Sequence, residues 1–135
     1  MGIIDDPTSA HLSSPATPFV AMVSEPQDYE DLISGRTVKA EESDFLSRLM
    51  FMQQTHKTYA GTSTVCTGVA SRIPGTIVNE VCRLETIGNL EVRFGHPGGV
   101  IQTEASVELQ GNEYITTRAT LGRTARRIME GQVYL

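Results

Sequence analysis

Residues 56–76 read His-Lys-Thr-Tyr-Ala-Gly-Thr-Ser-Thr-Val-Cys-Thr-Gly-Val-Ala-Ser-Arg-Ile-Pro-Gly-Thr. From position 64 to about 73 this stretch is rich in small residues, and a Pro-Gly pair stops it. This pattern is typical of a short helix enclosed closely by other backbone. Gly61 is expected to end an earlier helix just before it. The stretch therefore predicts a small-residue helix at the centre of the fold.

The residues before this stretch predict the earlier helix. Ser43 can cap it, and Asp44 suits its first turn. Apolar and aromatic side chains then recur every three or four residues, which places one face of the helix against a core. These positions are Phe45, Leu49, Met52, His56 and Tyr59. On this face, His56 is interpreted as a hydrogen-bonded core histidine rather than an acid or base.

The rest of the sequence is mostly β in pattern. Alternating polar and apolar residues or short apolar runs predict strands at 19–23, 76–84, 90–94, 101–109, 114–121 and 126–134. A polar loop is expected at 24–42. Residues 1–18 contain three prolines and several Ser and Thr residues, which favours a linker or flexible N-terminus. The sequence thus predicts one α+β domain over 19–135, with an antiparallel, barrel-like sheet wrapped around a central helix.

Composition limits the classes of partner. The chain has 135 residues and a formal net charge of -5, so its overall field opposes binding to nucleic acid or an anionic membrane. Arg123, Arg126 and Arg127 are interpreted as solvated or ion-paired. No signal peptide or membrane-length apolar run is visible, which favours a cytoplasmic location.

The cysteines and histidines indicate no metal site. The two cysteines are too few for a disulfide framework, and they show no metal-ligand spacing with the three histidines. Cys66 is expected to pack inside the small-residue helix, and Cys82 to lie in a strand. Neither a metal nor another cofactor is predicted.

Two elements together predict an anion site. The N–H groups around Thr62, Ser63 and Thr64 would point at a carboxylate or phosphate before the small-residue helix, although these residue types are also common as simple N-caps. A Gly-rich turn at 95–99 could bring its backbone close to the same ligand.

Side chains and backbone near these elements add further candidates. Lys57 is either a carboxylate partner or a solvated lysine. His96 either orients the turn by hydrogen bonding or contacts the ligand. Gly98 and Gly99 are expected on the same side of the sheet as the helix start.

As a set, seven segments of the chain resemble the PrpF family of isomerases. The resemblance extends over roughly 19–134, and the matching segments lie at 56–57, 64–67, 70–76, 78–79, 92–97, 123–126 and 129–131. This family is similar in fold to diaminopimelate epimerase, in which two related domains enclose the active site. The chain resembles the C-terminal domain alone. It departs from its relatives at Gly98, where they usually have Ser, and at Ser63, where they often have Gly.

The resemblance implies half of an active site. It assigns the proton-transferring Lys and Cys to the other domain, and Gly61 stands where the epimerase has a catalytic Cys, so no catalytic residue is assigned here. The implied function is carboxylate binding within a cofactor-independent isomerase that acts on small unsaturated di- or tricarboxylates such as aconitate. Substrate would contact Lys57, Thr62, Ser63, Thr64, His96, Gly98 and Gly99.

Two other hypotheses stay open at this point. The chain could be a non-catalytic binding or interaction domain that lacks the catalytic half, or it could self-associate so that two copies rebuild a cleft. An exposed apolar patch is expected where the missing N-terminal domain would dock, so the isolated chain should self-associate.

Overall fold

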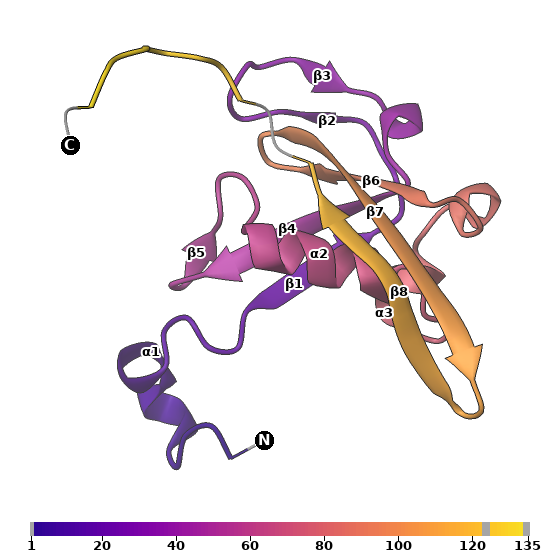
Figure 1. Cartoon of the computed structure of the whole chain (residues 1–135). Coiled ribbons are helices and arrows are strands. Elements are labelled where there is room, and N and C mark those ends of the chain that lie inside the picture. Colours follow the sequence, from indigo (N-terminus) through magenta and orange to yellow (C-terminus); the bar gives the residue numbers. More distant parts are fainter. Residues whose placement is uncertain (1, 123–124, 134–135) are drawn as a thin grey trace.

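The computed structural model describes residues 2–122 and 125–133. It is a mixed α+β structure in which a curled, half-barrel sheet partly encloses the longest helix, α2 (Figure 1). The sheet consists of β1 (Val20–Ser24), β4 (Phe45–Phe51), β5 (Gln54–Thr55), β6 (Glu91–His96), β7 (Gly99–Gln110) and β8 (Glu113–Leu121). The strand order is β1-β4-β6-β7-β8, and β5 pairs with β4.

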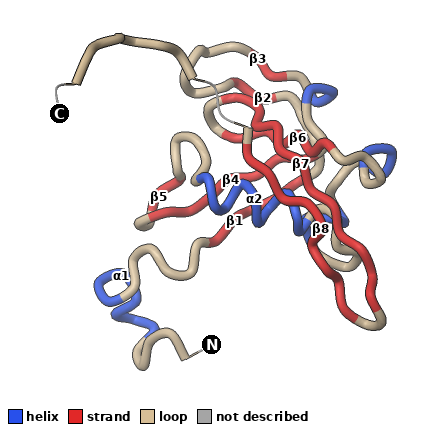
Figure 2. The backbone as a smooth tube through the Cα atoms, viewed as in Figure 1, coloured by secondary structure: helices blue, strands red, loops and turns tan. Residues whose placement is uncertain are grey.

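The sheet is antiparallel except for the pair β4 and β6, which is parallel. A separate hairpin is formed by β2 (Tyr29–Glu30) and β3 (Thr37–Val38). The helices are α1 (Ala10–Ser13), α2 (Gly61–Ala70) and α3 (Ile77–Glu80), with 3-10 turns at Pro7–Ser9, Ala40–Glu42 and Leu84–Thr86. Figure 2 shows how small the helical share is beside the strands.

The core lies between α2 and the inner face of the sheet. It consists of Phe45, Leu49, Tyr59, Cys82, Val92, Phe94 and Ala105. Phe94 is its centre, because its ring stacks on Phe45 with 5.2 Å between centroids and meets Tyr59 edge-on at 5.0 Å. The Tyr59 hydroxyl lies within hydrogen-bond distance of two buried hydroxyls, Ser47 Oγ at 2.8 Å and Thr67 Oγ1 at 3.0 Å.

The small-residue helix is confirmed, but it begins at Gly61 and not at Thr64. The Thr64 N–H already donates to Ala60 O at 2.8 Å, so Gly61 opens α2 instead of ending an earlier helix. Buried positions on α2 recur at helical spacing, at Thr64, Thr67, Gly68 and the following Ser71. Cys66 falls on the opposite face and is exposed, so the expectation that it packs inside is wrong.

The predicted helix over 43–59 is wrong, because this segment forms β4 and β5. In β4, Phe45 and Leu49 face the α2 side, while Leu46 and Arg48 face the β2–β3 hairpin. Both faces are covered and both accept bulky residues, so strand alternation is hidden. His56 is only half-buried, and its Nδ1 accepts a hydrogen bond from Thr58 N at 3.1 Å.

Other segments also differ from expectation. Residues 76–84 contain α3 rather than a strand, because the Thr76 hydroxyl caps a helical turn by accepting from Asn79 N. Cys82 is therefore buried beside a turn instead of in a strand. Residues 126–133 form no strand; Tyr134 lies outside the described residues, as do Arg123 and Thr124. The polar loop at 24–42 contains β2 and β3.

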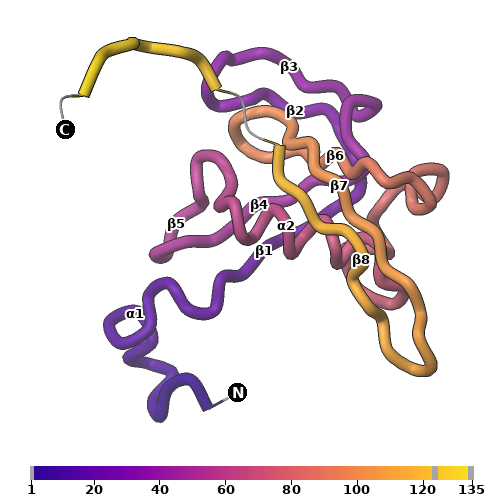
Figure 3. The backbone as a smooth tube through the Cα atoms, in the orientation of Figure 1, coloured from indigo at the N-terminus to yellow at the C-terminus, as the bar shows by residue number. Residues whose placement is uncertain are grey.

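The N-terminal segment has some local structure. Residues 7–13 form a 3-10 turn and the short α1 in place of a featureless linker, with Asp6 capping the turn through Thr8 N. Figure 3 shows this segment, in indigo, to one side of the sheet. The strands predicted at 19–23, 90–94, 101–109 and 114–121 are confirmed as β1, β6, β7 and β8.

Gly68 permits the close approach of α2 to β7. A Cβ at this position would lie 2.9 Å from Thr103 Cγ2, and Thr103 is held in place because its hydroxyl donates to Thr120 O. We expect Gly68→Ala to lower the free energy of unfolding by about 1–2 kcal/mol, despite the better helix propensity of Ala. Chemical denaturation followed by circular dichroism measures this loss.

Thr103→Ser removes the clashing methyl group and keeps the hydroxyl, so it should recover most of the loss in the double variant. Gly88→Ala is the matched control, because a Cβ there meets no atom within 4 Å. A Gly68→Ala protein as stable as the unmodified chain would contradict the close packing.

Candidate functional site

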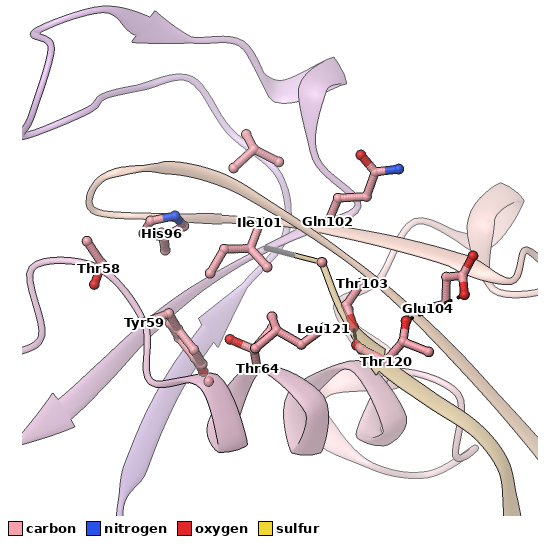
Figure 4. A pocket seen from close by; sticks show the side chains of 13 residues that line it. Thr58, Tyr59, Thr64, His96, Ile101, Gln102, Thr103, Glu104, Thr120 and Leu121 are labelled. Atoms are coloured by element: carbon pink, nitrogen blue, oxygen red, sulfur yellow. Dashed lines mark hydrogen bonds between the residues drawn. The ribbon is translucent and has the colours of Figure 1, made fainter. Parts of the chain in front are cut away.

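A cavity of about 730 Å³ lies beside the N-terminus of α2 (Figure 4). Its wall is made by residues at the start of α2, the end of β6, the first half of β7 and the end of β8. They are Thr58, Tyr59, Gly61, Thr64, His96, Val100, Ile101, Gln102, Thr103, Glu104, Thr120, Leu121 and Gly122. The pairing of β7 with β8 ends at Thr103 and Leu121, so the cavity lies where these two strands separate.

The first turn of α2 gives one wall an electropositive character. The first intrahelical bond comes from Thr64 N, so the N–H groups of Gly61, Thr62 and Ser63 precede the hydrogen-bonded ladder. Ala60 is the N-cap, and among the described residues no side chain caps the helix. The helix dipole adds partial positive charge at this end. This wall can therefore bind a carboxylate oxygen through backbone N–H groups.

His96 forms part of the opposite wall, at the end of β6. Of the two alternatives for His96, the hydrogen bond to the turn is present, because its Nδ1 accepts from Gly98 N at 3.1 Å, and contact with a ligand stays a prediction. Burial lowers the pKa of His96 to about 4, and the nearby Arg48 guanidinium contributes in the same direction. At neutral pH the imidazole is thus uncharged and faces the cavity.

Arg48 lies outside the cavity, on the face of β4 toward the β2–β3 hairpin, and the sequence did not reveal its place near His96. Its guanidinium lies over the Tyr29 ring, 4.8 Å from the centroid, and its Nη1 donates to Ser47 O at 2.9 Å and Gly95 O at 3.0 Å. Within residues 2–122 and 125–133 it has no carboxylate partner. Its positive charge near His96 is therefore not neutralised by an ion pair there.

The β2–β3 hairpin holds the Gly-rich turn from outside. Leu32 N donates to Pro97 O at 2.7 Å, and the Tyr29 hydroxyl donates to Gly99 O. At Gly98 a Cβ would lie 2.6 Å from Ile33 Cδ1, so the Ile33 side chain occupies the space that a larger residue would need. The Ile33 side chain on the hairpin therefore fills the space beside Gly98.

The predicted binding residues divide into two groups. Thr64 and His96 line the cavity. The other five are not among the lining residues: Thr62 and Ser63 lie in the first turn of α2, Lys57 is exposed in the loop before it, Gly98 lies in the turn after β6, and Gly99 begins β7. The structure therefore brings the helix start and the Gly-rich turn to one cavity. The contact of each residue with a ligand stays a prediction.

Outside this cavity, the described residues offer few other chemical centres. They contain no group of three or more His, Cys, Asp or Glu side chains arranged to hold a metal ion. The helices in this part of the chain are all too short or too polar to cross a membrane. Burial raises the pKa of the Cys82 thiol, which lies 3.7 Å from the Thr86 hydroxyl. Arg127 is exposed and pairs with Glu130 at 3.0 Å.

The uncharged state of His96 predicts how stability changes with acid. Its pKa is 6.5 ordinarily and about 4 in the folded chain, so the unfolded chain binds the extra proton first. Stability from this group is complete above pH 6.5 and is lost as the pH falls toward 4. Since one pKa unit corresponds to about 1.4 kcal/mol, the loss is about 3 kcal/mol.

His96→Gln has no such proton to gain. Carboxylates also titrate in acid, so the test is the difference between the two proteins in urea denaturation at neutral and acidic pH. The decrease in unfolding free energy should be about 3 kcal/mol smaller in His96→Gln. Equal decreases in both proteins would contradict the buried neutral imidazole.

Comparison with known proteins gives a consistent set of relatives. The PrpF protein family matches residues 1–135. The chain is 50% identical over 135 residues to 3-methylitaconate isomerase of Eubacterium barkeri, covering 100% of this chain and 34% of that protein. It is 40% identical over 119 residues to 2-methyl-aconitate isomerase of Shewanella oneidensis, covering 87% and 29% respectively.

A solved structure is similar as well. The crystal structure of methylitaconate-delta-isomerase aligns with a TM-score of 0.78 and 49% sequence identity, covering 96% of this chain and 32% of that chain. The chain thus spans about a third of the length of these two curated relatives.

Proposed function

This chain belongs to the PrpF family, and we propose that it supplies the carboxylate-binding part of an isomerase that acts on small unsaturated di- or tricarboxylates. The observation that carries this proposal is the shared cavity of the α2 N-terminus and His96. Backbone N–H groups with the helix dipole form one wall, and the buried, uncharged His96 imidazole forms part of another. Such groups suit carboxylate oxygens.

The reaction would be a proton transfer next to a carbon-carbon double bond. A proton leaves one carbon and returns to another as the double bond moves. Substrate and product therefore have the same atoms and the same oxidation level, and the reaction needs neither a metal nor an organic cofactor. The proton-transferring Lys and Cys implied by the family resemblance belong to the other half of the protein. The names of the relatives, which are isomerases of methylitaconate and methyl-aconitate, support this substrate class.

The finer features of the proposal come from the family resemblance. They are a diaminopimelate epimerase-like fold and a C-terminal position in the longer protein. A cytoplasmic location is a separate prediction, made from the sequence pattern. The half-barrel sheet around α2 agrees with such a domain. Val20 and Met22, exposed on one face of β1, are candidates for contact with the rest of the protein or with a second copy.

A titration with trans-aconitate tests the proposed role. The isolated chain should show no isomerisation by absorbance, because the proton-transferring groups are absent from it. It should still bind weakly, with a Kd on the order of millimolar. Amide chemical shifts should move at residues 61–64 and 96–99, where the cavity walls lie.

Lys57 and Lys39 provide a matched pair of variants, because both are lysines and only Lys57 lies beside the cavity. Lys57→Gln should weaken binding about two- to fivefold, as expected for an exposed charge, whereas Lys39→Gln should not. Lys39 instead pairs with Asp28 on the surface. Turnover by the pure chain, or shifts confined to residues far from the cavity, would refute the proposal.

A further inference from the structure

The two ring nitrogens of His96 have different surroundings. Nδ1 is 3.1 Å from Gly98 N and accepts its hydrogen bond. The whole residue is only 6% exposed, and it lines the cavity beside the α2 N-terminus. Among the hydrogen bonds of the described residues, the one from Gly98 N is the only one made by the His96 ring, and none involves Nε2. One nitrogen is thus used by the fold and the other is left for a ligand.

The hydrogen bond at Nδ1 fixes the position of the ring proton. A backbone N–H can only donate, so Nδ1 must be without a proton to accept. A neutral imidazole carries its single proton on the other nitrogen. We infer that His96 is held as the Nε2–H tautomer and donates this hydrogen to a carboxylate oxygen of the ligand. The identity of that ligand rests on the proposed function, whereas the tautomer does not.

The surroundings of the ring favour this neutral form. Burial of the ring is the main cause that disfavours a positive charge on it, and the Arg48 guanidinium of β4 and the His56 imidazole after β5 act in the same direction. Asp31 of the β2–β3 hairpin acts in the opposite direction. Its carboxylate, however, already accepts hydrogen bonds from the N–H groups of Ile33 and Ser34.

This tautomer limits what His96 can do in the reaction. With Nδ1 bonded to Gly98 and a proton on Nε2, the ring has no free lone pair with which to accept a proton. It therefore positions the substrate and is not the base. The same bond couples the turn to the ligand, because an oxygen held at Nε2 draws the ring and the Gly98 backbone into one hydrogen-bonded chain.

Long-range 1H–15N spectra of the labelled chain read the tautomer directly. The chain has only three histidines, so loss of one ring pattern in His96→Gln assigns it. The expected pattern is a protonated Nε2 and an unprotonated Nδ1, unchanged from about pH 8 to about pH 5. Addition of trans-aconitate should move the Nε2–H signal. A proton on Nδ1, or a charged ring at neutral pH, would overturn the inference.

Two amide variants provide a second readout. Gln reaches toward the Nε2 position and can still donate, whereas the shorter Asn reaches only toward Nδ1. His96→Gln should retain trans-aconitate affinity within about twofold, and His96→Asn should lose about tenfold. Equal affinities would count against donation from Nε2.

The two proposals fail in different ways. An unmodified chain that binds no trans-aconitate would refute the proposed ligand, while its ligand-free spectra would still decide the tautomer.

Discussion

Phe94→Ala is expected to destabilise the chain by about 3–5 kcal/mol, because it empties the centre of the core. The Phe94 side chain is fully buried between Phe45 and Tyr59. Domains of this size have a total stability of about 5–15 kcal/mol, so the variant should be close to unfolding. Urea denaturation followed by far-ultraviolet circular dichroism gives the difference.

Leu109→Ala is the matched control for this prediction. Leu109 lies near the far end of β7 and its side chain is exposed, so its truncation should change the free energy of unfolding by less than about 0.5 kcal/mol. Similar losses in the two variants would show that Phe94 is not the centre of the core.

Asp44→Ala should have the second-largest effect, a loss of about 3 kcal/mol. The Asp44 side chain is 1% exposed, and its carboxylate accepts from Arg93 N at 2.8 Å and from Arg93 Nη2 at 2.9 Å. Removal of the carboxylate leaves the buried N–H without an acceptor. The Arg93 side chain is 35% exposed, so water can solvate its guanidinium, and the expected loss lies at the low end for a buried pair.

Glu85→Ala separates the effect of burial from that of charge. Glu85 pairs with Arg83 at 3.5 Å, but its side chain is mostly exposed, so the loss should be about 0.5 kcal/mol or less. Denaturation midpoints of both variants are measured in the same buffer. If Asp44→Ala costs no more than Glu85→Ala, the buried carboxylate does not anchor β6.

The sequence predicts this fold best where one face of a strand is exposed to solvent and the other is buried. Glu91 and Arg93 alternate with buried Val92 and Phe94, which makes β6 visible in the sequence. β4 has no such signal, because α2 covers one face and the β2–β3 hairpin approaches the other. Its bulky residues then fall at helical spacing by chance. Tertiary contacts decide this segment, and a single sequence does not contain them.

The candidate site could be predicted only in part for the same reason. The small-residue helix and the Gly-rich turn are local patterns, and both lie at the cavity. Arg48 and Tyr29 support the β6–β7 turn from outside the cavity, and they could not be predicted because they belong to segments whose structure was predicted wrongly. Their position depends on the contact of the hairpin with β4, which no spacing in the sequence shows. An arginine within the largely apolar run 45–51 was the available signal.

The parallel pairing of β4 with β6 has a consequence for the order of folding. Phe45 pairs with Phe94 across the whole connection that contains α2 and α3, whereas β7 and β8 are joined by a tight turn and pair locally. Closing a long loop costs more conformational entropy, so the β7–β8 hairpin should form early and the β4–β6 pair late. Since α2 belongs to the connection that closes last, the cavity takes shape only when the chain completes its slowest step.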